Sequence, residues 1–180
     1  RFLSMPSYRN RILGLQLYKY NIKGFLQWGY NFYYSQLSQF EINPYLTTSA
    51  SFAFPSGDPF SVYPGKNEVL PSLRALIFKE ALQEIELCRL LESFIGKEAV
   101  VEMIEKHANM EITFRDYPRN SEFLPSLNDK IKEEIKKFKK EWVAFWADVK
   151  KKAPEYAGIA DVCLGFIMKK FYDSDIDHPD

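Results

Sequence analysis

A short run rich in aromatic residues, GFLQWGYNFYY at residues 24–34, is the feature that most constrains the fold. Aromatic side chains favour pleated, half-buried surfaces, so the run predicts a β-strand. Successive side chains of a strand point to opposite faces, and in this run both faces are largely apolar. Strands that are apolar on both faces are typical of α/β proteins, in which helices cover the sheet on each side. The run therefore predicts a buried strand in an α/β fold.

The composition excludes several classes of protein. The chain has 180 residues, a length that suits one domain, and a formal net charge of +0. Without a net charge, no overall field attracts nucleic acid or an anionic membrane surface, and no apolar run is long enough to cross a bilayer. Cys88 and Cys163 stand in apolar contexts that favour buried free thiols, with a disulfide as the alternative. We expect a cytoplasmic protein with no nucleic-acid or membrane partner.

Apolar residues recur at spacings of three and four through most of the chain, which predicts helices. The longest such stripe runs without a break from Leu124 to Val149, with Ser121 as the expected N-cap and Pro154 as the end. Lysines and glutamates fill the other positions, as is typical of a solvent-exposed helix face. The expected helices span residues 7–20, 72–96, 97–108, 121–153 and 156–172, and the acidic residues 173–180 are expected to fray.

A long segment without helical or strand periodicity follows the aromatic run, at residues 35–59. Loops of this length are usually functional or disordered, and the aromatic residues within this one favour an ordered loop. A second short strand is expected at residues 60–63, ending at Pro64-Gly65, and a helix follows it. The chain thus contains two segments in which a strand precedes a helix, as in parallel sheets.

Motifs for common enzyme chemistry are absent. The sequence has no phosphate-binding loop, dinucleotide fingerprint, nucleophile elbow or zinc spacing, so we expect no cofactor and no metal. The adjacent Glu133 and Glu134 lie in a lysine-rich helix, which favours a solvated helix face over a catalytic pair. Asp58 is the most notable acid because glycine and proline fix the turn around it. Asp side chains commonly cap such turns, so a structural role and a ligand-binding role both stay open.

Four segments, in a fixed order, carry a family resemblance: RFLSMPSYRNRILG (1–14), GFLQWGYNFYY (24–34), INPYLTTSASFAFPSGDPFSVYPG (42–65) and PSLRALIFKEALQEIELCRLLE (71–92). Together they resemble the C-terminal end of the catalytic domain in glycoside hydrolase family 123-like proteins, also catalogued as domain of unknown function 4091. The succession GDPF, YPG and SLR is the most specific part. The resemblance runs to about Ile135, so we expect a partial glycoside hydrolase-like barrel segment at 1–135 and a helical extension at 136–180.

The resemblance implies a (β/α)8 barrel that acts on glycosides, and the characterised members are N-acetyl-hexosaminidases with substrate-assisted chemistry. In that family an Asp-Glu pair on an earlier strand is catalytic, and the present sequence contains no Asp-Glu dipeptide. The expected fold is therefore a helix-rich α/β chain, the C-terminal fragment of such a barrel, with two short strands followed by long C-terminal helices. No catalytic residue is assigned, and whether the chain is an enzyme stays open.

The resemblance also directs attention to a sugar-binding wall. Trp28 and Tyr30 would stack on sugar faces, and Trp28 is expected to be partly exposed beside Asp58. Plain core packing is the alternative for both rings. The expected partners are a glycan and either a second copy of the chain or the N-terminal part of the barrel. The alternative function is a helical interaction module that self-associates through residues 121–153. The expected substrate-binding residues are Trp28, Tyr30, Asn31, Asp58 and Tyr63.

Overall fold

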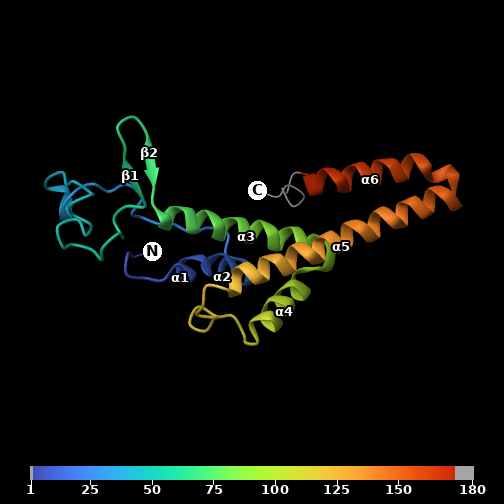
Figure 1. Cartoon of the computed structure of the whole chain (residues 1–180), viewed down its shortest axis with the longest axis horizontal. Coiled ribbons are helices and arrows are strands. Elements are labelled where there is room, and N and C mark those ends of the chain that lie inside the picture. The colour runs from blue at the N-terminus through green and yellow to red at the C-terminus, as the bar shows by residue number, and fades with distance from the viewer. Residues whose placement is uncertain (1, 173–180) are drawn as a thin grey trace. The chain divides into compact units, whose positions relative to one another are not determined.

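The computed structural model describes residues 2–172, so the expected fraying of residues 173–180 lies outside the described part. The chain is a helix-rich α/β protein (Figure 1), and its described residues form one sheet of two antiparallel strands. In chain order the elements are α1 (Ser7–Arg11), α2 (Leu13–Lys19), the 3-10 turn η1 (Gln36–Ser38), β1 (Val62–Pro64), β2 (Val69–Pro71), α3 (Leu73–Ile95), α4 (Lys97–Ala108), α5 (Phe123–Lys152), the 3-10 turn η2 (Pro154–Tyr156) and α6 (Ala157–Tyr172).

The helices lie where the apolar spacing predicts them. The expected helix at 7–20 is present but breaks at Ile12 into α1 and α2. The hydroxyl of Ser72 accepts a hydrogen bond from the amide of Ala75 at 3.2 Å, which caps the start of α3. Gly96 ends α3 with a left-handed φ of 83°, a conformation that glycine adopts without strain. These local signals therefore define α3 at both ends.

The start of α5 differs from its predicted position. The side-chain oxygen of Asn120 accepts hydrogen bonds from the amides of Phe123 at 2.8 Å and Glu122 at 3.2 Å. The hydroxyl of Ser121 instead donates to the carboxylate of Glu122 at 2.6 Å. The prediction of Ser121 as the N-cap is thus wrong, because the amide side chain one residue earlier takes the free helix donors. The predicted end is confirmed, since α5 stops before Pro154.

The prediction that residues 24–34 form a strand is wrong. The segment is extended but makes only isolated antiparallel bridges, between Asn31 and Phe60 and between Tyr34 and Glu41. Its backbone bonds are divided between two places: the amide of Ser61, before β1, donates to the carbonyl of Tyr30 at 2.7 Å, and the amide of Ile42 donates to the carbonyl of Tyr33 at 3.0 Å. A strand needs a continuous ladder as well as strand-favouring residues, and the neighbouring segments here do not supply one.

The two strands form a hairpin instead. β1 overlaps the expected strand at 60–63, whereas β2 is an additional strand that the sequence pattern did not indicate. Val62 pairs with Pro71, and Pro64 pairs with Val69. Neighbouring strands of a (β/α)8 barrel are parallel, while the pairings among the described residues are antiparallel. The α/β class is therefore present, and a barrel arrangement is not observed.

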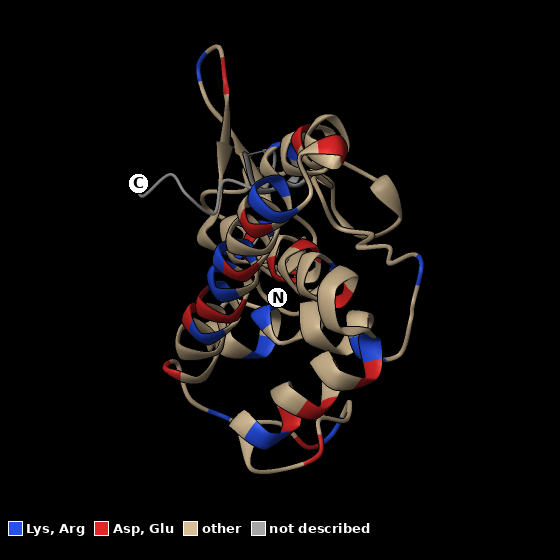
Figure 2. Cartoon of the chain, turned by 90° about the vertical axis from the view of Figure 1, so that its right-hand side faces the viewer, with Lys and Arg blue, Asp and Glu red and all other residues tan. Residues whose placement is uncertain are grey.

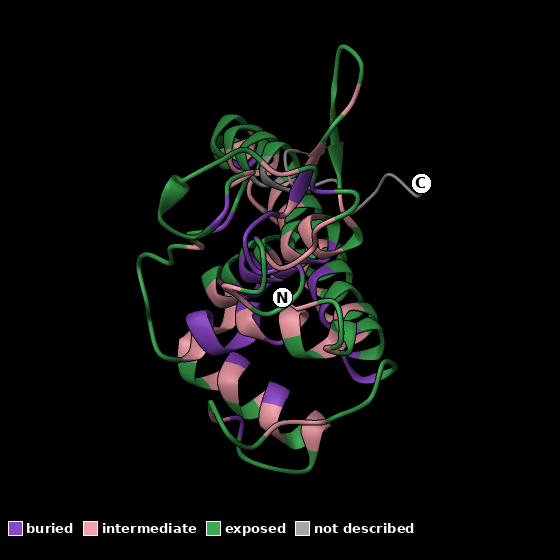
Figure 3. Cartoon of the chain, turned by 90° about the vertical axis from the view of Figure 1, so that its left-hand side faces the viewer, coloured by how far each residue is buried: buried purple, intermediate pink, exposed green. Residues whose placement is uncertain are grey.

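The chain divides into two compact units. The first comprises Arg1–Ile85 and Ala108–Leu124, and the second comprises Glu86–His107 and Pro125–Asp180. Each unit has its own buried apolar residues, drawn in purple in Figure 3. In the first unit they include Ile12, Leu15, Phe60, Ile77, Ala81 and Ile112; in the second they include Cys88, Leu91, Val100, Ile104, Leu127, Ile131 and Ile135. The expected division at residue 135 stays a prediction.

The surface chemistry of the helices is mixed. Acidic and basic residues are interspersed along them (Figure 2), as the sequence indicates for α5. Both cysteines have free thiols; Cys88 is buried and Cys163 is half-buried. Among the described residues, no helix is both long enough and apolar enough to span a membrane.

Candidate functional site

Helices α1, α2 and α3 form the support of the candidate site in the first unit. The guanidinium of Arg11 contacts the carboxylate of Glu84 at 2.6 Å and that of Glu80 at 3.0 Å, which ties α1 to α3. Gly14 lies so close to α3 that a Cβ at this position would stand 2.2 Å from the carbonyl oxygen of Ala81. Only glycine allows this approach of two helix backbones.

A glycine also allows a close backbone contact between the aromatic segment, residues 24–34, and the GDPF turn, residues 57–60. A Cβ on Gly29 would lie 1.9 Å from the backbone oxygen of Asp58, so the two backbones touch where Gly29 has no side chain. The neighbouring Gly57 has a φ of 85°, which favours glycine in this turn. Two glycine-containing motifs separated by about 30 residues thus meet, and they bring the side chains next to Gly29 and Gly57 together.

Trp28 and Asp58 are in direct contact. The indole Nε1 of Trp28 donates a hydrogen bond to Oδ2 of Asp58 at 3.2 Å. The indole ring also packs against Phe54, with ring centroids 4.6 Å apart, and against Phe32 at 5.7 Å. Trp28 is nevertheless 41% exposed, while Asp58 is only 6% exposed. We call these four residues the Trp28 corner: a buried carboxylate and two rings hold an exposed indole in a fixed orientation.

The other expected site residues lie in different surroundings. Tyr30 and Asn31 follow Trp28 in the same segment, and both are exposed. Tyr63, on β1, is half-buried, and its ring lies 5.3 Å from Tyr45 and 5.4 Å from Phe60. The structure therefore brings Trp28 and Asp58 into contact and keeps Tyr30 and Asn31 beside them in sequence, whereas Tyr63 belongs to a separate aromatic cluster.

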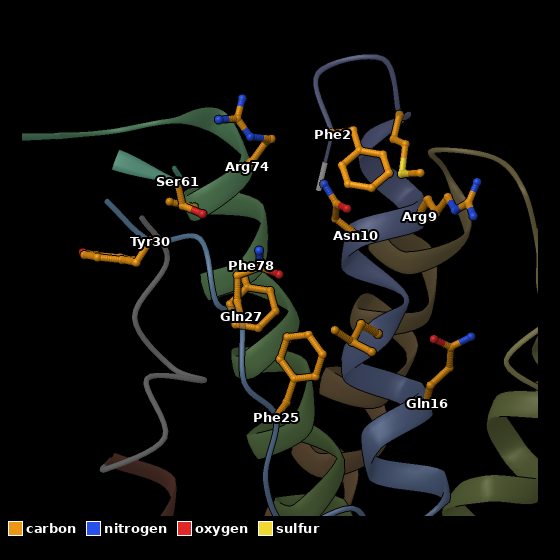
Figure 4. Close-up of a pocket in the computed structure, with 13 residues that line it drawn as sticks. Phe2, Arg9, Asn10, Gln16, Phe25, Gln27, Tyr30, Ser61, Arg74 and Phe78 are labelled. Carbon is orange, nitrogen blue, oxygen red and sulfur yellow. The ribbon is translucent and has the colours of Figure 1, made fainter. Parts of the chain in front are cut away.

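A pocket of about 570 Å³ lies between α1, α2, the aromatic segment and the start of α3 (Figure 4). Its walls are mainly apolar, and Phe25 and Phe78 pack together within it at a centroid distance of 5.5 Å. Of the five expected site residues, Tyr30 is the one that lines it. The lining residues are Phe2, Met5, Arg9, Asn10, Leu13, Gln16, Phe25, Gln27, Tyr30, Ser61, Arg74, Ala75 and Phe78.

Arg74 is a residue of this pocket that the sequence reasoning missed. Its Nη2 donates to the backbone carbonyl of Phe60 at 2.7 Å. Its Nε is buried and has no hydrogen-bond partner among the described residues. The guanidinium therefore holds the turn before β1, and the side chain lines the pocket at the start of α3. The SLR segment of the family resemblance contains this arginine, and that segment was the one signal that could have identified it.

The phenol of Tyr33 is a hydrogen-bond donor beside the site. The hydroxyl of Tyr33 donates to the backbone carbonyl of Val62 at 2.8 Å. Burial, followed by the neighbouring phenols of Tyr45 and Tyr30, raises the pKa of Tyr33 above its ordinary value. Among the described residues, no three side chains of the metal-ligating types gather into a group.

Comparison with known protein families identifies the first half of the chain. Residues 1–91 match the family described as glycoside hydrolase 123, catalytic domain. The chain belongs to this family. The matched glycoside hydrolase 123 region contains the whole Trp28 corner and every residue that lines the pocket, and residues 92–180 lie outside it. The family expected from the four sequence segments is confirmed. Among curated proteins the chain finds no match.

Proposed function

We propose that the glycoside hydrolase 123 region binds carbohydrate through the Trp28 corner. The observation that carries this proposal is an indole ring that is 41% exposed yet held by a buried carboxylate and by Phe54. Aromatic rings present a broad apolar face together with a polar edge, which suits the apolar C–H face of a sugar ring. A ring fixed before binding loses little conformational freedom when a ligand stacks on it.

Asp58 acts in this proposal by positioning Trp28. Its carboxylate accepts the indole N–H, and the low exposure of the residue leaves little of it for direct contact with a ligand. The exposed Tyr30 and Asn31 supply the polar contacts. A phenol hydroxyl and a side-chain amide can each donate and accept hydrogen bonds, which matches sugar hydroxyl and acetamido groups. Tyr63 is a more distant contact residue.

The family supports the ligand class that we propose. The resemblance implies N-acetyl-hexosaminides, whose acetamido group offers one donor and one acceptor. We infer that the region derives from the last part of a (β/α)8 barrel, because a helical segment, an extended aromatic segment, the β1–β2 hairpin and a long helix succeed one another along the matched residues. The antiparallel pairing of β1 with β2 would then be a departure of this chain from the parallel strand pairing of the barrel.

We expect the chain by itself to have no measurable hexosaminidase activity. The sequence has no Asp-Glu dipeptide, and a general acid alone contributes roughly 10²–10⁴-fold to such reactions. The assay is hydrolysis of a chromogenic N-acetyl-β-hexosaminide. Turnover that is lost in Asp58→Ala would show that the chain carries its own catalytic carboxylate.

The binding experiment is a calorimetric titration with an N-acetylglucosamine oligosaccharide, because its signal does not depend on the indole that the test variant removes. Trp28→Ala is the test variant, and Trp142→Ala is its matched control, because Trp142 is 38% exposed but lies in α5 outside the matched region. We expect saturable binding in the wild type and the control and none in Trp28→Ala. If Trp28 were a core residue, its truncation would cost about 3–5 kcal/mol of stability and leave the ligand response unchanged. That result would refute the proposed site.

A further inference from the structure

The apolar stripe of α5 continues beyond the part of the helix that the second unit buries. Leu127, Ile131 and Ile135 are fully buried. At the next turn Phe138 stacks on Phe94 of α3, with ring centroids 5.8 Å apart. The same spacing then places Trp142 and Phe145 on the continuation of the stripe, where both are exposed. The second half of α5 thus continues the apolar spacing of the first half, but its apolar side chains are exposed rather than buried.

Helix α6 also carries exposed apolar side chains. It turns back after α5 (Figure 1), and the carboxylate of Asp161 pairs with Lys150 of α5. Ala160 is fully buried on one flank of α6. A different flank carries Ile159, Val162 and Phe166, spaced by three and four residues, and all three are exposed. A helix that is apolar on more than one flank is normally covered on each of them.

The exposed apolar area is large enough for a stable protein interface. We call six of the exposed apolar side chains of the α5–α6 hairpin the hairpin patch. With about 150–250 Å² for each fully exposed aromatic side chain, the patch exposes on the order of 700 Å². A typical monomer leaves at most ~300–600 Å² in its largest apolar patch, and each partner of a standard interface buries about 800 Å². The patch consists of Trp142, Phe145, Tyr156, Ile159, Val162 and Phe166.

The charges around the patch favour a second copy over a charged surface. Residues 142–166 contain three acidic side chains and three lysines, and two pairs join them: Asp148 with Lys152 at 2.8 Å, and Asp161 with Lys150. Such a set of charges has no single sign that would select an anionic lipid surface. The formal net charge of the chain is +0, so two copies meet without overall repulsion.

We propose that the hairpin patch is the interface of a homodimer. In a two-fold symmetric pair, α5 and α6 of one copy pack on the same helices of the other and form a four-helix arrangement. The patch lies in residues 142–166, outside the glycoside hydrolase 123 match. The role of these residues is therefore association, and it is independent of the proposed sugar site.

The test is sedimentation equilibrium of the full chain over a wide range of concentrations. The test variants are Phe145→Lys and Phe166→Glu. Each new charge has an opposite charge three or four residues away on its own helix, Glu141 for the first and Lys169 for the second, so helicity is preserved. Phe40→Lys is the matched control, because Phe40 is 57% exposed and Phe145 is 56% exposed, and Phe40 lies in the other unit.

We expect a dimer in the wild type and the control, and a dissociation constant at least tenfold higher in each test variant. Far-UV circular dichroism is recorded on the same samples to establish that the variants are folded. A wild-type chain that is monomeric at 100 μM would overturn the proposal, as would a dimer that both test variants leave unchanged. A monomer that instead binds vesicles of anionic and zwitterionic lipid would also overturn it and assign the patch to a membrane surface.

Discussion

The ion pair between Arg11 and Glu84 gives the sharpest prediction for the stability of the first unit. Glu84 is only 1% exposed, and Arg11 Nε lies 2.6 Å from its Oε1. Replacing Arg11 by Met leaves the buried carboxylate without this cation, and breaking a buried pair in this way costs about 3–5 kcal/mol. Because Arg11 itself is partly exposed, we expect the lower end, about 3 kcal/mol. For a chain of this length that corresponds to a decrease in Tm of roughly 6–12 °C.

The matched control is Arg89→Met. Arg89 makes a contact of the same length, 2.6 Å, with Glu86, but both side chains are largely exposed. Exposed pairs contribute about 0–1 kcal/mol, so this variant should shift Tm by no more than a few degrees. The double variant Arg11→Met with Glu84→Leu should recover most of the lost stability, because the buried carboxylate at position 84 is then removed as well. Thermal unfolding followed by circular dichroism measures all four proteins. Equal Tm values for Arg11→Met and Arg89→Met would refute the reasoning.

Two further predictions concern a backbone contact and a pH dependence. Gly29→Ala should lower the free energy of unfolding by about 1–3 kcal/mol, because its Cβ would stand 1.9 Å from the backbone oxygen of Asp58. Gly24→Ala should be neutral, since nothing lies within 4 Å of a Cβ at that position. Equal urea denaturation midpoints for the two variants would contradict this prediction. Burial and then Lys130 lower the pKa of His107, so its protonation favours the unfolded chain and stability should fall as the pH drops below about 6.5. His107→Gln should flatten the dependence of Tm on pH between 7.5 and 5.5, and an unchanged slope would show that other groups cause it.

The helices could be predicted because their signals are local. Apolar spacing places α3 and α5, and Gly96 ends α3 through its own backbone freedom. The N-cap of α5 was assigned to Ser121 rather than Asn120 because both residue types accept from free helix amides, and only the geometry decides between neighbours. Local patterns therefore define the helices to within a residue or two.

The strands could not be predicted in the same way. The aromatic content of residues 24–34 favours a strand, but a strand forms only where another segment supplies a matching ladder. Here Phe60, before β1, and Glu41 each supply a single bridge, and β1 pairs with β2, a stretch of three residues with no clear periodicity. Long-range pairing is information that a local pattern does not carry.

The candidate site was predictable only in part. Trp28 is partly exposed beside Asp58, as the sugar-wall hypothesis expects, and Gly29 explains the close approach. The burial of Asp58 was not foreseen, because a turn residue is usually exposed. Arg74 was missed because a long side chain at a helix start can point in many directions until its acceptor, the carbonyl of Phe60, is known.

The most direct test of carbohydrate binding is to follow the indole N–H resonances of the chain by nuclear magnetic resonance. The sequence has three tryptophans, and Trp28 is the one in the matched region, while Trp142 and Trp146 lie in α5. Addition of an N-acetylglucosamine oligosaccharide should shift the Trp28 indole resonance saturably and leave the other two in place. An unchanged Trp28 resonance at millimolar oligosaccharide, with the protein folded, would contradict the proposed site.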